Sequence, residues 1–330
     1  MKFGMFGGAR SVPGVDDGYH EGYSAYIDAV LEAEALGYYS NFLVEHHFSG
    51  MGQVSASLSL LSYLAAQTKT IRLGTAVVVL PWHNPVLVAE QAATLDLLSN
   101  GRFDFGVGKG YRYNEFEGFC IPIEESTERF EEAMEVIRKA WTTKGRFSHH
   151  GKRWHYDNII IEPEPVQKPH PPFWLAAGRP ESLRYAAQEG YNLFLDQFQT
   201  FEVMLERFHI YREAVLETGR EFTPHSVAVA RGLLIAKTAA EREAAIAARM
   251  KSQEVMNAHG TSSDKSVKSS MVSDPDLRKA ATEGTLIGTP EEIIERLKSL
   301  EREGVDYVIL STRGNDALRV FAEEVMPAFA

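Results

Sequence analysis

Residues 41–52 read NFLVEHHFSGMG and join a run of β-forming residues directly to three titratable side chains. Glu45, His46 and His47 follow the run at 42–44, and a glycine-containing loop opens after them. A strand buried on both faces normally stays apolar to its last residue. Polar groups at the carboxyl end of such a strand are typical of active sites in α/β barrels and open α/β sheets. The stretch therefore predicts a buried parallel strand that ends either in an active site or in a pair of structural core histidines.

Strands and helices alternate along the chain at the spacing of repeated βα units. Short runs of β-forming residues predict strands at 2–6, 38–45, 71–80, from 101 onward, and at 173–176, 192–195, 227–235 and 306–310. Apolar residues at helical spacing predict helices at 22–36, 55–67, 86–98, 125–143, 180–188, 201–218, 239–256 and one that ends near 326. Eight strands alternating with helices predict an α/β fold, the (β/α)8 TIM barrel, as a single domain over residues 1–330.

Two segments do not fit this alternation of strands and helices. Residues 147–172 contain a polar, histidine-rich patch and five closely spaced prolines, which predict a small hairpin excursion followed by an extended connection. Its three histidines, His149, His150 and His155, are expected to face solvent. Residues 257–284 are rich in Ser, Asp and Lys, which predicts a mobile loop that is either a lid or simply disordered.

The composition excludes several classes of partner and site. The net charge of −11 argues against nucleic acid and acidic membranes, because neutralising phosphates requires clustered Lys and Arg. The single cysteine excludes an internal disulfide and a cysteine-ligated zinc or iron–sulfur site. No apolar run approaches the roughly 20 residues that span a bilayer. We therefore expect a cytoplasmic protein.

Two further segments join His46 at the predicted carboxyl end of the barrel. Residues 106–110 form a glycine-rich segment with Lys109, and residues 177–182 open a helix and carry Arg179. Glycine-rich loops and helix amino ends present N–H groups to anions. Together the two segments predict a bound phosphate group, although either segment alone is as often a tight turn.

Several motifs resemble the bacterial luciferase-like flavin-dependent monooxygenases, in particular the alkanal monooxygenase α-type branch. They are EHHF, GTAVVVLPWHNPVLVAEQAATLDLLSNGRFDFGVGKG, PPFWLAAGRPES and GTPEEIIERL, in the family's order and spread over nearly the whole chain. The resemblance implies a two-component monooxygenase that takes reduced FMN from a separate flavin reductase. It also implies a reaction with O2 through a C4a-peroxyflavin that oxygenates a small organic substrate such as an aldehyde or ketone, and a homo-oligomer, most simply a dimer.

The resemblance assigns roles to individual residues. His46 matches the family's catalytic histidine and would act as an acid or base near the flavin. Ala76 and Val77 match a site where the family often has a non-prolyl cis peptide against the flavin ring. The predicted phosphate- and flavin-binding residues are Lys109, Tyr111, Arg129, Ala177, Gly178, Arg179 and Ser182.

The chain also departs from the family pattern, and other functions stay open. Gly108 stands where luciferases carry a reactive cysteine, so light emission is not expected. Lys109 replaces an arginine, which keeps the charge but loses the forked geometry. The alternatives are a deazaflavin-dependent oxidoreductase of the same superfamily, a non-catalytic flavin-binding subunit, and a metal-dependent barrel hydrolase that uses Glu45 and His46. Aromatic residues that could line the pocket suggest an apolar substrate; they are Phe6, Trp82, Tyr111, Tyr113 and Phe198.

Overall fold

Parallel strands close into a barrel in the computed structural model, which describes residues 1–261, 276–312 and 314–329. The barrel strands, in order around it, are β1 (Lys2–Gly7), β2 (Ser40–Leu43), β3 (Arg72–Thr75) with its continuation β4 (Val78–Val79), β5 (Phe103–Gly108), β8 (Phe173–Ala176), β9 (Asn192–Leu195), β10 (Val227–Ile235) and β12 (Tyr307–Ser311). The pairing of β1 with β12 closes the ring, with Lys2 opposite Tyr307. The predicted (β/α)8 barrel is confirmed.

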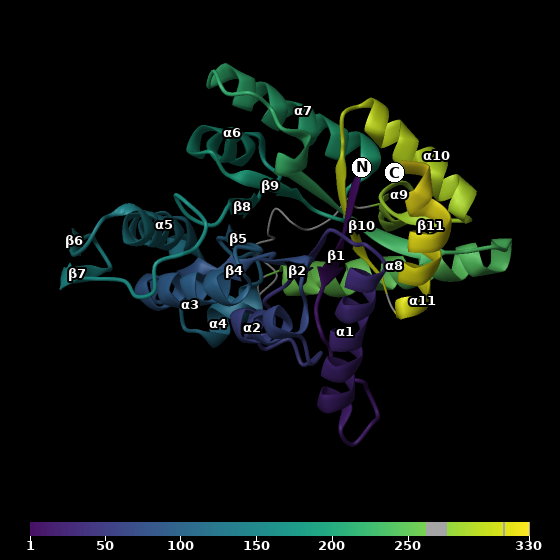
Figure 1. Ribbon diagram of the computed structural model, residues 1–330. Coiled ribbons are helices and arrows are strands. Elements are labelled where there is room, and N and C mark those ends of the chain that lie inside the picture. The colour runs from purple at the N-terminus through teal and green to yellow at the C-terminus, as the bar shows by residue number, and fades with distance from the viewer. Residues whose placement is uncertain (262–275, 313, 330) are drawn as a thin grey trace.

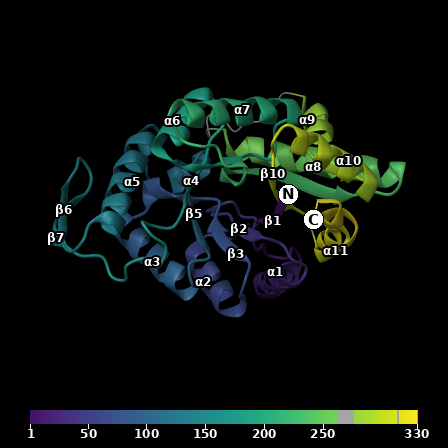
Figure 2. The ribbon, with the colours of Figure 1, turned by 45° about the horizontal axis from the view of Figure 1, so that its top comes forward.

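Helices surround the barrel and connect its strands (Figures 1 and 2). They are α1 (Gly18–Ala35), α2 (Ser57–Gln67), α3 (Pro85–Leu98), α4 (Tyr113–Gly118), α5 (Ser126–Thr142), α6 (Pro180–Glu189), α7 (Phe201–Glu217), α8 (Ala239–His259), α9 (Leu277–Glu283), α10 (Pro290–Arg302) and α11 (Asn315–Val320). Within the described ranges, none of these helices combines the length and the apolar character needed to cross a membrane.

The barrel interior is filled with side chains. Phe42, Trp174, Phe194 and Tyr307 are almost fully buried there and pack edge-on or stacked, with 4.8 Å between the ring centroids of Phe42 and Phe194. The alternate positions on the same strands point outward and pack against the helices. Because the centre holds no space for a ligand, the fold offers the carboxyl ends of the strands as its binding surface.

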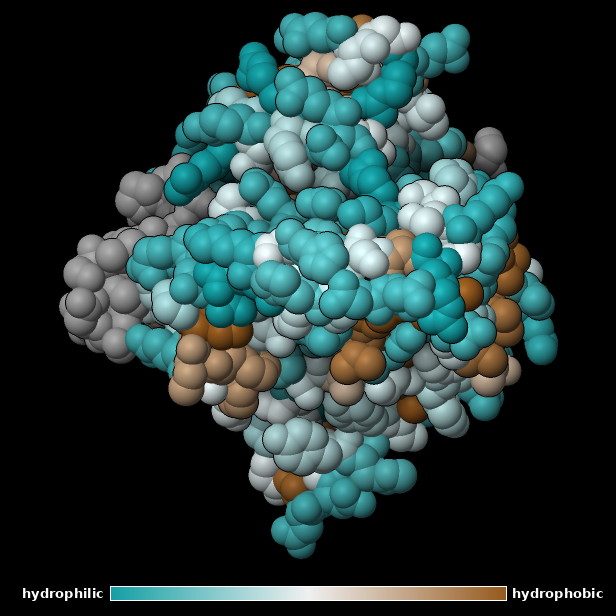
Figure 3. Space-filling model, turned by 90° about the vertical axis from the view of Figure 1, so that its left-hand side faces the viewer, coloured by the Kyte–Doolittle hydropathy of each residue, from teal (hydrophilic) through white to brown (hydrophobic). Residues whose placement is uncertain are grey.

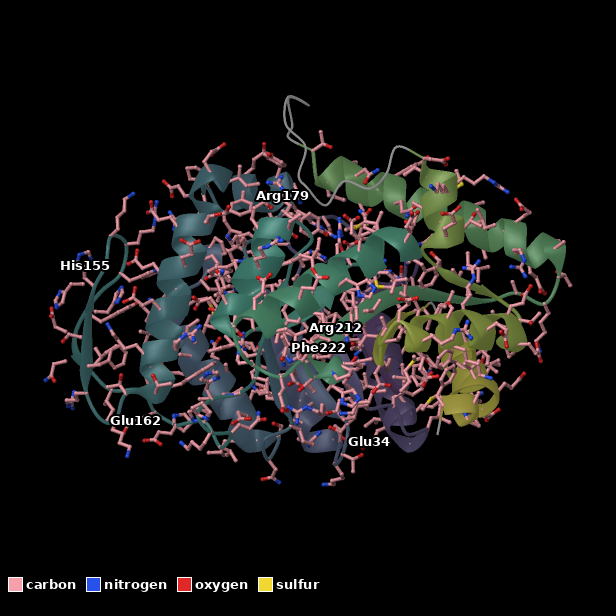
Figure 4. The ribbon with its side chains drawn as sticks, turned by 90° about the horizontal axis from the view of Figure 1, so that it is seen from above. Glu34, His155, Glu162, Arg179, Arg212 and Phe222 are labelled. Atoms are coloured by element: carbon pink, nitrogen blue, oxygen red, sulfur yellow. The ribbon has the colours of Figure 1, made fainter. Side chains whose placement is uncertain are left out.

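A hairpin projects from the barrel beside α5, as predicted (Figure 1). Its antiparallel strands are β6 (Phe147–His150) and β7 (His155–Ile159). His150 and His155 are exposed as expected, and His155 lies on the outer strand (Figure 4). The expectation for His149 is wrong: its side chain is buried and hydrogen-bonds Glu132 at 3.3 Å, because alternation along β6 turns it toward α5. The face that carries the hairpin is mostly hydrophilic with separate hydrophobic patches (Figure 3).

The predicted strand at 71–80 is interrupted. β3 ends at Thr75, the Ala76–Val77 peptide bond is cis, as the resemblance implied, and β4 then resumes the pairing with β5. The glycine-rich segment expected to form a loop after the fourth strand instead lies mostly within β5, which continues to Gly108. A Cβ at Gly106 would lie only 1.8 Å from the Thr75 carbonyl oxygen, so glycine here permits the close approach of β3 and β5.

The mobile loop predicted over 257–284 has helical ends. α8 extends to His259, and α9 covers Leu277–Glu283. Residues 262–275, the remainder of that prediction, lie outside the described residues. A short strand that the sequence did not predict, β11 (Leu286–Gly288), pairs in parallel with the end of β10.

Candidate active site

His46 lies in the loop directly after β2 and is held by a carboxylate from helix α4. Its Nδ1 lies 3.0 Å from Glu115 Oε1, and the same oxygen accepts the backbone N–H of His47 at 2.9 Å. Glu115 is buried in α4, a six-residue helix that no sequence pattern predicted. The His46 side chain is 14 % exposed, so one edge of the ring stays accessible.

A buried arginine adds a positive charge beside this pair. Arg112 Nη1 lies 3.7 Å from Glu115 Oε1, and its Nη2 lies 3.2 Å from Met256 Sδ. Burial, aided by the Arg112 charge, lowers the pKa of His46 to about 4, although Glu115 opposes the shift. At neutral pH His46 is therefore uncharged. Because a carboxylate only accepts hydrogen bonds, the Nδ1 of His46 carries the proton and its Nε2 keeps a free lone pair.

Glu45, the first titratable residue of the motif, has a different environment. Its Oε1 accepts hydrogen bonds from Trp82 Nε1 at 2.9 Å, His83 Nε2 at 2.8 Å and His47 Nε2 at 3.1 Å. Glu45 and His46 thus bind separate partners, which argues against the metal-dependent hydrolase. Across the described ranges, no three His, Cys, Asp or Glu side chains form a group that could hold a metal ion.

Lys109 lies beside the first turn of α5, and Arg129 belongs to that part of the helix. Lys109 Nζ lies 3.4 Å from Thr127 Oγ1 and 5.8 Å from the centre of the Tyr185 ring in α6. Arg129 Nε donates to Glu125 Oε2 at 2.9 Å. Lys109 thus lies between α5 and α6, whereas Arg129 is already paired with Glu125, the residue just before its own helix.

The start of α6 lacks a capping side chain. Arg179 occupies the N-cap, makes no cap hydrogen bond and is exposed beside the helix (Figure 4). By contrast, α10 begins with a complete capping box around Thr289. Ala177 and Gly178 connect β8 to this helix start, and Ser182 lies in its first turn. The first N–H groups of α6 are therefore left for an external anion.

Arg207 of α7, which sequence reasoning missed, adds a cation to the same loop. A Cβ at Gly178 would lie 2.9 Å from Arg207 Nη1, so the guanidinium lies directly over this glycine. Arg207 also pairs with Asp196, the residue after β9, at 2.7 Å. Tyr111 follows β5, and its ring meets His46 edge-on with 6.4 Å between the centroids. The structure therefore groups His46 with Tyr111, and Gly178 with Arg207, at the carboxyl end of the barrel.

Comparisons with known proteins identify the family of the chain. The model of the luciferase-like monooxygenase family matches residues 1–307. The chain belongs to this family. The family resemblance drawn from the motifs is thereby confirmed.

Individual relatives of this luciferase-like monooxygenase differ in how much of it they match. The oxygenase component of the flavin-dependent trigonelline monooxygenase of Acinetobacter baylyi is 26% identical and aligns over 93% of this chain and 90% of its own. The uncharacterized protein y4vJ of Sinorhizobium fredii is 34% identical, but over only 54% of this chain and 52% of its own length. The crystal structure of monooxygenase RslO1 from Streptomyces bottropensis is 25% identical, superimposes with a TM-score of 0.84 and covers 100% of both chains.

Proposed function

We propose that this luciferase-like monooxygenase is the oxygenase component of a two-component system that uses reduced FMN and O2 to oxygenate a small organic molecule. The observation that carries the proposal is the neutral His46 held by Glu115 at the barrel mouth, together with an uncapped helix start after β8. The relative that matches nearly the full chain is itself named a flavin-dependent oxygenase component. Another relative is named as FMNH(2)-dependent.

The residues at the mouth fit FMN. The uncapped amino end of α6 and the guanidinium of Arg207 over Gly178 provide the donors that a phosphate requires. Lys109 and the exposed Arg179 add positive charge on either side. The cis Ala76–Val77 bond, partly buried between β3 and β4, is the proposed contact for the flavin ring, with Tyr111 nearby.

Reduced FMN, when bound, supplies the electrons that activate O2, so that one oxygen atom enters the substrate and the other leaves as water. The protein's part is to bind, orient and move protons. His46 is positioned as a base, since Glu115 fixes its Nδ1–H and leaves Nε2 free to accept a proton. Glu115 acts as a positioning residue that sets the tautomer, and burial, aided by the charge of Arg112, keeps His46 uncharged.

We further propose a transient flavin reductase as partner and a homodimer as the working assembly. Helices α2 and α3 pack against each other and together expose several large apolar side chains, among them Tyr63, Leu87, Leu97 and Leu98. Such a patch is typical of a protein–protein interface. Size-exclusion chromatography with light scattering would report a mass near 37 kDa for a monomer and twice that for a dimer. A cytoplasmic location stays a prediction.

An anaerobic titration tests the choice of cofactor. We expect reduced FMN to bind with a dissociation constant in the micromolar range or below, and a deazaflavin such as F420 to bind at least tenfold more weakly. Tighter binding of F420 would favour the deazaflavin-dependent oxidoreductase. Tight binding of reduced FMN with no incorporation of ¹⁸O from ¹⁸O2 across a substrate panel would favour a non-catalytic flavin-binding subunit.

A further inference from the structure

Unpartnered buried polar atoms gather in one part of the barrel mouth. Among the described residues, nine buried side-chain nitrogen or oxygen atoms have no hydrogen-bond partner. Six of the nine belong to Arg231 of β10, Arg249 and Gln253 of α8, and Thr285 before β11. Leaving such atoms unsatisfied costs stability, which is why native proteins have few of them. Four of these six atoms belong to Arg249, Gln253 and Thr285, and their grouping indicates a ligand site.

Three of these side chains, those of Arg249, Gln253 and Thr285, lie together, whereas Arg231 points to the other face of β10, over the Phe201 ring. A Cβ at Gly232 would be 2.9 Å from Thr285 Cγ2 and 3.6 Å from Arg249 Cζ, so both side chains converge over this glycine. Gln253 lies one helical turn beyond Arg249 on the same face of α8. It is fully buried, and neither its amide nitrogen nor its amide oxygen has a partner within the described part of the chain. We call Arg249, Gln253 and Thr285 the α8 polar face.

The cluster also has an excess of positive charge. Arg207, Arg231 and Arg249 all interact electrostatically with one carboxylate, that of Asp196. Burial, together with the repulsion from Arg249 and Arg207, lowers the pKa of Arg231 to about 10. Burying unpaired charge is costly. Arg249 donates through Nη1 and Nη2 to Gln197, and its Nε–H is left for an oxygen of a carboxylate. The cluster is therefore incomplete without an anion.

The α8 polar face leads toward His46. Met256 follows Gln253 by three residues, and its Sδ accepts a hydrogen bond from Arg112, which borders Glu115. Seven residues of helix separate Arg249 from Met256, or about 10 Å. A small molecule held at Arg249 could thus extend along α8 to the histidine.

We propose that the α8 polar face binds the carboxylate of an anionic organic substrate, with Arg249 pairing the carboxylate and Gln253 and Thr285 hydrogen-bonding the same end of the molecule. The proposal rests on the proposed function, because it assumes that the mouth binds the molecule to be oxygenated. It also replaces the expectation of an apolar substrate with a substrate that carries a negatively charged end. Phe198, one of the predicted pocket aromatics, lies with its ring centre 5.0 Å from Arg249 Cζ and forms part of the same surface.

The test compares carboxylates with their neutral amides. Benzoate and nicotinate, and the matched probes benzamide and nicotinamide, are titrated into the full-length protein with FMN bound, and binding is followed by saturation-transfer NMR. We expect each carboxylate to bind at least tenfold more tightly than its amide. Arg249→Met should abolish this preference, and Lys251→Met, which removes an exposed charge from the same helix, should leave it intact.

Three results would overturn the proposal. One is equal affinity for carboxylates and amides, and another is a preference that survives in Arg249→Met. The third is an Arg249→Met variant that loses affinity for FMN but not for riboflavin, since that would assign the anion site to the flavin phosphate. Failure of the wild-type protein to bind reduced FMN would instead refute the proposed function, and it is measured separately.

Gln253→Leu gives a second test that does not depend on the arginine. Replacing an unsatisfied buried amide with a side chain of similar size should raise Tm by about 1 to 3 °C. The same variant should weaken carboxylate binding at least threefold. A variant that is more stable and binds benzoate as tightly as the wild type would remove Gln253 from the site.

Discussion

The two ends of the barrel differ in how completely their arginines are hydrogen-bonded. At the amino end, Arg102 uses all five of its N–H groups, on the carbonyls of Ala65, Thr68, Ile71 and Ser99 and the hydroxyl of Thr68. At the carboxyl end, Arg231 donates only through Nη1, and both Arg231 and Arg249 keep unpartnered donors. An arginine whose N–H groups all have hydrogen-bond partners stabilises the fold. One with buried N–H groups that lack partners lowers the stability of the folded protein.

The carboxylates show the same contrast. Asp104 at the amino end binds Arg72 through both oxygens, at 2.7 and 3.0 Å, and accepts the indole N–H of Trp174 at 3.1 Å. Burial alone would lower the pKa of Arg72, but Asp104 raises it above its usual value. At the carboxyl end, Asp196 is shared among three arginines. The charged groups at the amino end are paired with one another and stabilise the fold. At the carboxyl end one carboxylate faces three arginines, so positive charge is in excess where a ligand would bind.

Breaking the pair at the amino end should give the largest effect. Asp104→Ala leaves the largely buried Arg72 without its partner, so we expect the free energy of unfolding to fall by about 3 to 5 kcal/mol. Urea denaturation measures the change, with the exposed Asp157→Ala as control. A loss below about 1 kcal/mol would show that the amino end is not the stabilising end.

Removing the base at the carboxyl end should affect turnover and not folding. His46→Ala deletes the group that accepts a proton, so we expect turnover to fall at least about 100-fold while reduced FMN still binds within about threefold of wild type. The exposed His150→Ala is the control. Unchanged turnover would exclude His46 from the chemistry.

Acid should destabilise the wild-type protein through His46. Its pKa is about 4 when folded and near 6.5 when unfolded, so the unfolded state binds the extra proton between these values. The free energy of unfolding is therefore highest above pH 6.5 and falls as the pH decreases toward 4. Between pH 7 and 5 the decrease due to His46 is about 2 kcal/mol. Urea denaturation of wild type and His46→Gln at both pH values measures it. An identical pH dependence of the two proteins would contradict the assigned neutral state.

The phosphate contacts should give the smallest effect. The double variant Lys109→Ala, Arg179→Ala should weaken FMN about tenfold and riboflavin much less, because only the phosphate contact is lost. Lys139→Ala, farther along α5, is the control. Equal losses for FMN and riboflavin would place the phosphate elsewhere.

The sequence predicted the barrel and the position of His46 because both depend on local patterns. Apolar runs and helical spacing repeat eight times, and a polar group after a buried strand is visible in a single stretch. Glu115, Arg207 and Arg249 could not be predicted in the same way. Each lies on a helix far from its partner in the chain, and their pairing depends on how the loops and helices pack over the mouth.

Glycine was the least reliable of the sequence signals. Gly106 and Gly108 suggested a phosphate loop but serve mainly to bring β5 close to β3 and β4. A Cβ at Gly108 would lie 2.6 Å from Val77 Cγ2, next to the cis bond. Gly178 is different, since Arg207 lies above it. The same residue type thus permits strand contact in one place and exposes backbone to a cation in the other.

The most direct test of the account is to bind reduced FMN anaerobically to the full-length protein and then mix it with oxygenated buffer in a stopped-flow spectrometer. The account predicts that the protein binds the flavin and delays the return of oxidised-flavin absorbance well beyond that of free reduced FMN. His46→Ala should bind equally well but shorten this delay. No binding, or reoxidation at the rate of free flavin, would contradict the central claim that the carboxyl end of this barrel is an FMN-dependent oxygenase site.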